Sequence, residues 1–185
     1  MESLSRAQYA WIALRCQSGE AGAFEDLMAV MERPLFCYAL TLTGSEDGAL
    51  DVLQEVWLRA FRGIRKLKDP GALRPWLYSI THGIAIDGIR RNVAREHAEA
   101  AHSDEFEEAE EPSFANADAA AIYEALSRID AKHREVLALH FLDDLSLTEI
   151  AAVIGCSEGT VKSRMHYAKR AMKKNLEGVH HGTRK

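Results

Sequence analysis

The 185-residue sequence has few of the features that mark membrane-bound, secreted or disulfide-rich proteins. No apolar run approaches the roughly 18–20 residues that a membrane-spanning helix requires, and the N-terminus lacks the basic-then-apolar order of a secretory signal. The three cysteines, Cys16, Cys37 and Cys156, are an odd number without a C-x-x-C pair, which favours inert thiols in a reducing compartment. Only 4 prolines and 8% aromatic residues favour an all-α fold. We therefore expect a soluble, cytoplasmic, helical protein that makes no membrane contact of its own.

The residue patterns of common enzymes are also missing. The sequence contains no glycine-rich phosphate loop and no nucleophile–base arrangement. A metal-dependent enzyme could use His97, His102, Asp104 and Glu107, but these residues fall in a stretch without a rigid element to hold them. We expect no catalytic activity, no metal site and no cofactor.

The net charge of -5 conceals an uneven distribution along the chain. Residues 1–96 hold 12 acidic and 12 basic side chains, residues 97–118 hold 8 acidic and no Lys or Arg, and residues 119–185 hold 8 acidic and 11 basic. The acidic stretch has no sustained apolar stripe, as is typical of a flexible linker. We predict two small helical domains, 1–96 and 119–178, joined by an acidic linker over 97–118 and followed by a disordered tail over 179–185.

The clearest local pattern runs from Ser146 to Lys174 and predicts a helix-turn-helix. Ser146 and Glu149 have the spacing of a capping box, Gly155 can adopt the positive φ that ends a helix, and Ser157 can cap the next helix. The apolar residues of that second helix recur at helical spacing: Val161, Met165, Ala168 and Met172. From Glu158 to Lys174 six Lys and Arg residues accompany one acid, a net charge of +5. A helix that is apolar inside and basic outside fits a DNA major groove. Two further amphipathic helices, over 119–130 and 132–142, would complete a four-helix unit.

Apolar spacing in the first domain predicts several helices. Two lie within 5–32, separated at Gly19 and Gly22, with Pro34 near the end of the second and a buried helix over 35–42. A helix over 49–64 has a predicted apolar face of Leu50, Leu53, Trp57, Ala60, Phe61 and Ile64. Its opposite face is polar, with Asp51, Glu55, Arg59 and Arg62, and Glu55 and Arg59 are placed to form an i,i+4 ion pair.

A basic segment follows that helix. Between Arg59 and Arg74 there are six Lys and Arg residues and one Asp, with a turn at 69–71 and a stop at Pro75. Basic residues beside aromatic ones suit single-stranded nucleic acid. We interpret Trp76 as a core residue at the start of the next helix, and Tyr78 as an outward-facing stacking platform.

The helix from Trp76 to about Arg95 has apolar residues on two faces. Ile86, Ile89 and Val93 form the second face, so the helix is either sandwiched within the domain or offers this face to a partner. Gly83 and Gly88 inside it indicate close packing or the close approach of a ligand.

Together these stretches resemble the extracytoplasmic-function group of bacterial RNA polymerase sigma factors. In the first domain the resemblance rests on ALDVLQEVWLR at 49–59, WLYSI at 76–80 and IDGIRR at 86–91. In the second domain it rests on Ile129-Asp130, REV at 134–136, SLTEIAAVI at 146–154 and EGTVKSR at 158–164. The resemblance covers nearly the whole chain in order and spacing.

The resemblance implies a subunit that binds core RNA polymerase and promoter DNA, directs transcription initiation and is controlled by an anti-sigma factor. It implies docking on the clamp of the largest polymerase subunit by Asp51, Gln54, Glu55 and Arg59. The 66–73 loop and the next helix would capture a flipped base of the minus-10 element, through Lys66, Lys68, Arg74, Tyr78, His82, Arg90 and Arg91. The helix-turn-helix would read the minus-35 element through Thr160, Lys162, Ser163, Arg164, His166, Tyr167, Lys169 and Arg170. The first helices of the second domain would hold the flap of the second-largest subunit.

One alternative keeps the helix-turn-helix but not the polymerase. A stand-alone transcriptional regulator would bind an operator tightly without polymerase. This alternative gives no reason for the residues of the first domain that resemble the sigma factors.

Overall fold

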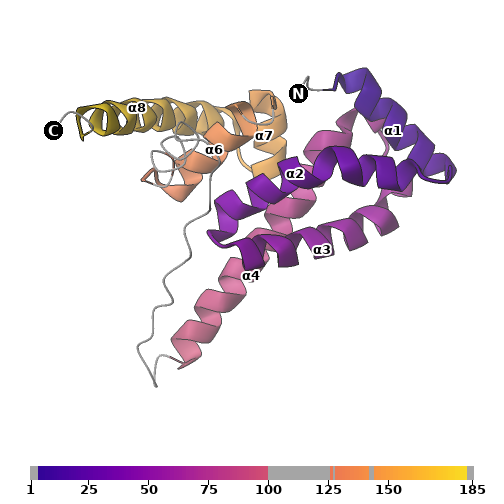
Figure 1. Cartoon of the computed structure of the whole chain (residues 1–185), viewed down its shortest axis with the longest axis horizontal. Helices are drawn as coiled ribbons and strands as arrows, with labels where there is room; N and C mark the ends of the chain where they lie inside the picture. Colours follow the sequence, from indigo (N-terminus) through magenta and orange to yellow (C-terminus); the bar gives the residue numbers. More distant parts are fainter. Residues whose placement is uncertain (1–3, 100–125, 127, 142–143, 183–185) are drawn as a thin grey trace. The chain divides into compact units, whose positions relative to one another are not determined.

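The structure is a computed structural model that describes residues 4–99, 126, 128–141 and 144–182, of which 93–99 and 177–182 are described as helical backbone alone. All regular elements within these residues are helices, which confirms the predicted all-α fold (Figure 1). The chain divides into two compact units, Met1–Glu108 and Ala109–Lys185. Each unit is described by itself.

The described residues of unit 1 form four α-helices and two short 3₁₀ helices (Figure 1). The elements are α1 (Arg6–Ser18), α2 (Ala23–Thr43), α3 (Glu46–Gly63), η1 (Ile64–Lys66), η2 (Pro70–Ala72) and α4 (Leu73–Glu99). Gly19 and Gly22, at φ 74° and 79°, make the turn between α1 and α2, where a side chain would strain the backbone. The predicted break between the first two helices is therefore confirmed.

Helix α2 does not end near Pro34, as the sequence predicts, but continues through it to Thr43. The buried helix expected over 35–42 is the second half of this one helix. Met31, Leu35 and Tyr38 are almost completely buried on either side of the proline. Packing of these side chains against α3 and α4 keeps the helix continuous despite the missing N–H.

The buried face of α3 differs from the predicted one. Its core side chains are Ala49, Val52, Leu53, Val56 and Ala60. Leu50 is 49% exposed and Phe61 is 67% exposed, so their predicted burial is wrong. Helix α3 packs against both α2 and α4, and this double contact buries the side that carries small and β-branched residues. The Phe61 ring lies at the surface, edge-on to Phe24 at 5.2 Å.

Helix α4 begins before Pro75 and ends after the predicted position. Pro75 is the third residue of the helix, in the first turn, where its missing N–H breaks no helical bond. The helix then continues to Glu99, beyond the expected end near Arg95 and into the predicted acidic linker. A Cβ added at Gly83 or Gly88 would meet no atom within 4 Å, so close packing within unit 1 does not explain these glycines.

Unit 2 contains α6 (Ala131–Phe141), α7 (Leu147–Ile154) and α8 (Glu158–Gly182). The helix expected over 119–130 lies mostly outside the described residues. Side chains from α6, α7, α8 and the α6–α7 connection form the core of the described part of unit 2, among them Val136, Leu139, Leu145, Ile150 and Val161. Because α8 continues to Gly182, the tail predicted to be disordered is helical over 179–182.

Two leucines on α3 test its observed orientation. We expect Leu53→Ala to lower the free energy of unfolding of unit 1 by about 2–4 kcal/mol, because it leaves a cavity in the core. Leu50→Ala should change it by no more than about 0.5 kcal/mol, because the side chain is half exposed. Urea unfolding followed by tryptophan fluorescence measures unit 1 alone, since Trp11, Trp57 and Trp76 all lie there. Equal losses for the two variants would contradict the observed face.

Candidate functional site

The turn between α7 and α8 is built by local hydrogen bonds that the sequence predicts. The Ser146 hydroxyl accepts from the Glu149 amide at 3.2 Å, and the Glu149 carboxylate accepts from the Ser146 amide at 2.9 Å. Gly155 ends α7 at φ 65°, and the Thr160 amide donates to the Ser157 hydroxyl at 3.1 Å. The predicted capping box and both caps are confirmed. In addition, the Thr148 hydroxyl donates to the Glu158 carboxylate at 2.6 Å, which fixes α7 against the start of α8.

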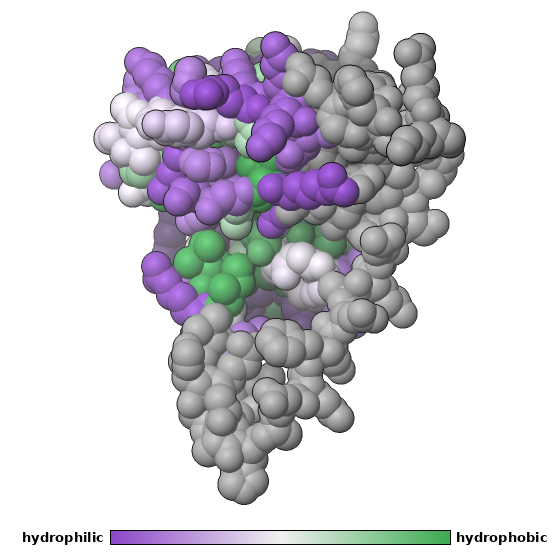
Figure 2. Space-filling model, turned by 90° about the vertical axis from the view of Figure 1, so that its left-hand side faces the viewer, coloured by the Kyte–Doolittle hydropathy of each residue, from purple (hydrophilic) through white to green (hydrophobic). Residues whose placement is uncertain are grey.

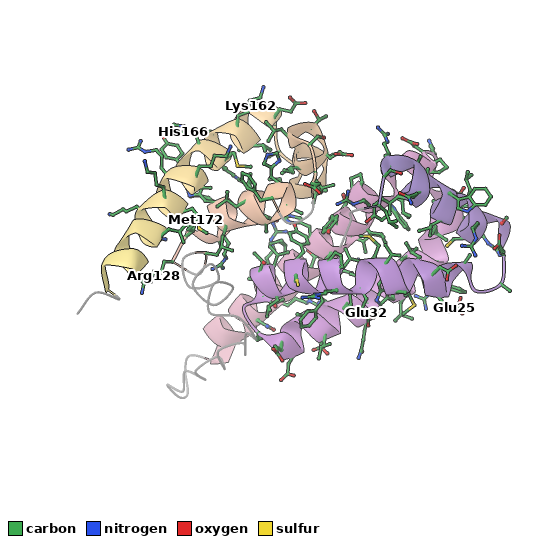
Figure 3. The ribbon with its side chains drawn as sticks, turned by 45° about the horizontal axis from the view of Figure 1, so that its top comes forward. Glu25, Glu32, Arg128, Lys162, His166 and Met172 are labelled. Atoms are coloured by element: carbon green, nitrogen blue, oxygen red, sulfur yellow. The ribbon has the colours of Figure 1, made fainter. Side chains whose placement is uncertain are left out.

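Helix α8 has an apolar inner side and a basic outer side. Val161, Met165 and Ala168 are buried, and Met172 is half-buried. Lys162 and His166 point away from α6 and α7, whereas Met172 lies on the inner side (Figure 3). Hydrophilic side chains gather over α8 in the space-filling view (Figure 2). The predicted minus-35 residues that are exposed are Lys162, Ser163, His166, Tyr167, Lys169 and Arg170, while Thr160 and Arg164 are half-buried.

The two ends of α6 contact opposite flanks of α8. The His133 ring lies 5.8 Å from the Tyr167 ring, and the Tyr167 ring lies 5.6 Å from the His166 ring. On the other flank the Lys169 ammonium lies 5.3 Å from the centre of the Phe141 ring. Tyr167 and Lys169 are therefore held by protein contacts. The exposed residues between them, Ser163, His166 and Arg170, are left accessible to a ligand.

In unit 1 a groove runs between α3 and α4. Asp51, Glu55 and Arg59 line it from α3, and Arg90 and Arg91 line it from α4. The predicted ion pair is confirmed, with Glu55 Oε1 2.7 Å from Arg59 Nε. The structure thus brings three of the four predicted polymerase-binding residues together with two predicted DNA-binding arginines. Gln54, the fourth, is exposed on α3 and does not line the groove.

The groove is also lined by residues outside the predicted polymerase-binding and DNA-binding sets. Asp87 lies 4.0 Å from Arg90, and its backbone carbonyl accepts from Arg91 Nε at 3.2 Å. Ile89 and Gly48 line the same groove. The apolar spacing of α4 indicates Ile89, but only the packing of the two helices places it in one groove with Gly48 of α3.

The predicted minus-10 residues do not form one cluster. Lys66 and Lys68 are exposed between α3 and α4. The Arg74 guanidinium lies 4.9 Å from the centre of the Tyr9 ring of α1. From Arg74 to Arg91 the axis of α4 extends about 25 Å, at 1.5 Å per residue. A ligand would have to follow α4 to contact the whole set.

Tyr78 is completely buried, so its predicted role as a stacking platform is wrong. Its ring packs edge-on against Tyr38 of α2, with 5.3 Å between ring centres. His82, one turn further along α4, is half-buried, and its Nδ1 lies 3.3 Å from the Tyr38 hydroxyl. Trp76, expected in the core, is half-buried and lies across Gly63, where an added Cβ would be 3.0 Å from its ring.

Two family profiles match the chain, one on each unit. Sigma-70 region 2 matches residues 27–95, and Sigma-70 region 4 matches residues 119–172. The ECF RNA polymerase sigma factor SigL of Mycobacterium tuberculosis is 35% identical over 167 residues, which cover 86% of this chain and 94% of the relative. SigW of Bacillus subtilis, also an ECF RNA polymerase sigma factor, is 26% identical over 175 residues, covering 88% of this chain and 94% of SigW. The chain belongs to the ECF RNA polymerase sigma factors.

The fold of this sigma factor resembles solved structures. The sigma factor RpoE of Bartonella quintana, determined in complex with the anti-sigma factor NepR, superimposes with a TM-score of 0.73. That likeness has 22% sequence identity and covers 85% of this chain and 98% of RpoE. The family assignment confirms the predicted function: the protein binds core RNA polymerase and promoter DNA and directs transcription initiation.

In the described part of the sigma factor we find neither a metal-binding cluster nor a membrane-spanning helix. Those residues include no group of three or more His, Cys, Asp and Glu side chains that could hold a metal ion, and the side chains at 97–107 lie outside them. None of the described helices is long and apolar enough to cross a membrane. Burial raises the pKa of the Cys16 thiol, which donates to the Ala23 carbonyl at 3.2 Å. Cys37 is exposed and Cys156 is half-buried.

Two glycines in the helix-turn-helix allow a matched test of its turn. We expect Gly155→Ala to destabilise unit 2 by about 1–2 kcal/mol, because an alanine at φ 65° is strained although its Cβ has room. Gly159→Ala, in the first turn of α8, should stabilise unit 2 by up to about 1 kcal/mol. Amide hydrogen exchange of peptides from α7 and α8 in the full chain measures both changes. Effects of the same sign would contradict the observed turn.

Proposed function

We propose that the sigma factor uses its two units to hold two promoter elements while both units are docked on core polymerase. Residues 1–96 would dock on the clamp and melt the minus-10 element, and residues 119–178 would contact the flap and read the minus-35 element. Residues 97–118 would tether the two domains. On this proposal the protein acts in the cytoplasm and has no catalytic activity of its own.

The observation that supports this proposal best is the outer side of α8. Lys162, Ser163, His166 and Arg170 are exposed opposite a buried stripe, and the capped turn before them fixes their direction. In a helix-turn-helix the N-terminal residues of the second helix reach the base edges. We propose that Lys162, Ser163 and His166 contact bases, with Thr160, Arg164, Tyr167, Lys169 and Arg170 contacting the edges of the site and the phosphates.

For unit 1 we propose two neighbouring surfaces. Asp51, Gln54, Glu55 and Arg59 would bind the clamp. DNA would be bound by the loop with Lys66 and Lys68 and by positions along α4, namely Arg74, His82, Arg90 and Arg91. Tyr78 is left out of this set because it is buried.

We also propose that an anti-sigma factor controls the protein. Ile86 is half-buried on α4, and Ile89 is exposed in the groove between α3 and α4. A partner helix with an apolar face could cover both and block the polymerase-binding residues beside them. The side chain of Val93, the third member of this predicted face, lies outside the described ones.

Two lysines on α8 test the minus-35 assignment. We expect Lys162→Ala to lower promoter-dependent transcription about tenfold and to change the preferred bases, because Lys162 lies near the start of the helix. Lys174→Ala removes the same charge from an exposed site three turns later and should lower transcription less than about threefold, with unchanged preference. Run-off transcription with core polymerase on a randomised promoter library measures both. Tight, sequence-specific binding of the same DNA without polymerase would favour a stand-alone regulator instead.

Two acidic residues of unit 1 test the docking surface. Asp51→Lys should weaken binding to core polymerase by about tenfold or more, because it replaces a negative charge on the proposed docking surface with a positive one. Glu32→Lys makes the same charge change on the exposed side of α2 and should alter the affinity less than about twofold (Figure 3). Fluorescence anisotropy of labelled protein titrated with core polymerase gives both affinities. If Glu32→Lys were as damaging as Asp51→Lys, total charge and not the α3 surface would govern docking.

A further inference from the structure

The segment between α3 and α4 has little regular structure, but the residues at both of its ends are anchored in the core. Ile64, at its start, and Leu73, at its end, are buried in the core of unit 1. Between them η1 and η2 each make a single turn. Under the proposed function this segment captures a base that has been pulled out of the DNA stack. A segment that binds an unstacked base must be ordered beforehand, because unstacking already costs a few kcal/mol and ordering each residue costs about 1–2 kcal/mol more.

One side chain of α1 bonds to both ends of η1. Gln17 Nε2 donates to the carbonyl oxygen of Ile64 at 3.0 Å and to that of Leu67 at 2.7 Å. A carboxamide nitrogen has two hydrogens, so one group can serve both carbonyls. The Leu67 amide also donates to the Ile64 carbonyl at 3.1 Å. Gln17 therefore closes the turn from outside, at the point where the chain leaves α3.

The N-terminal half of α1 contacts the rest of the segment. Arg6 lies 3.3 Å from Asp69, whose other carboxylate oxygen accepts from the Gly71 amide at 2.9 Å and caps η2. The Arg6 guanidinium also covers Gly71, where an added Cβ would lie 2.9 Å from Arg6 Nε. The Arg6–Asp69 pair is exposed, so it adds little by itself. The less exposed part of the support comes from Gln17, which is half-buried, and from the buried ring of Tyr9 beneath Arg74.

We propose that α1 is the scaffold of the base-capturing segment and that Gln17 is its positioning residue. The inference rests on the proposed function of the 66–73 loop. Helix α1 lies before residue 27, where the Sigma-70 region 2 profile begins to match. Gln17 touches no DNA in this scheme. It keeps two backbone carbonyls in place, and with them the Lys66 and Lys68 side chains that flank Leu67.

The test uses holoenzyme made from core polymerase and the full chain. A fluorescent single-stranded oligonucleotide carries the non-template minus-10 sequence selected from the randomised library. The measured quantity is the affinity ratio between the selected base and a substituted base at the most constrained position. Gln17→Met keeps the length of the side chain but removes both donors. It should lower this ratio roughly tenfold while the affinity for core polymerase stays within about twofold.

Two further α1 variants separate positioning from a general structural effect. Gln17→Lys retains a donor that reaches the same carbonyls and should keep most of the discrimination. Leu14→Met changes an exposed position of α1 that makes none of these contacts and should have no effect. Unchanged discrimination in Gln17→Met, or an equal loss in Gln17→Lys, would overturn the proposal. If Gln17→Met weakens folding, hydrogen exchange of the free chain decides: exchange at 64–69 must rise more than exchange in α2.

Asp69→Ala separates failure of this inference from failure of the proposed function. It removes the cap of η2 inside the segment itself. If Asp69→Ala lowers the discrimination and Gln17→Met does not, the segment captures the base but α1 does not position it. If neither variant changes the ratio, the segment is not the base-capturing element, and both proposals are wrong.

Discussion

Burial of α2 organises unit 1 and is strong enough to keep the helix continuous through a proline. An interior proline costs about 3 kcal/mol in lost hydrogen bonding and steric conflict. Fully burying a large apolar side chain returns roughly 1.5–3 kcal/mol, and Leu35 and Tyr38 are both buried after Pro34. Those two side chains alone offset the cost. Because α2 contacts α1, α3 and α4, its course determines which faces of those helices remain exposed.

Several exposed surfaces follow from that arrangement. With Val52 and Val56 turned into the core, Asp51, Glu55 and Arg59 must lie outside, and α4 places Arg90 and Arg91 beside them. The same packing encloses Tyr78 against Tyr38 and leaves the segment after α3 to be held by α1. The polar side chains that form the groove are exposed because the apolar faces of α3 and α4 are used to fill the core.

The sequence predicts best where the signals are local. The capping pair Ser146–Glu149 and the positive φ of Gly155 each depend on residues within one turn, and both agree with the structure. The orientation of α3 was not predictable in this way, because apolar residues such as Val52, which is buried, and Phe61, which is exposed, occur on opposite sides of the helix. The burial of Tyr78 depends on Tyr38, forty residues earlier, and no spacing within α4 encodes that contact. The support of Ile64 and Leu67 by Gln17 is equally non-local.

The packing of α6 limits which residues of α8 can decide base preference. Tyr167 is paired with His133 and Lys169 with Phe141, so a base contact by either residue would have to replace a contact inside the protein. Between those flanks lie Ser163, His166 and Arg170. In the described structure a base contact by these residues would replace no such internal contact, apart from the edge contact of His166 with Tyr167. Sequence preference should therefore follow the central residues, with the flanks fixing how the helix is presented. Since the net charge of +5 over 158–174 is spread across both groups, salt dependence alone does not distinguish them. Only the base preference of single variants does.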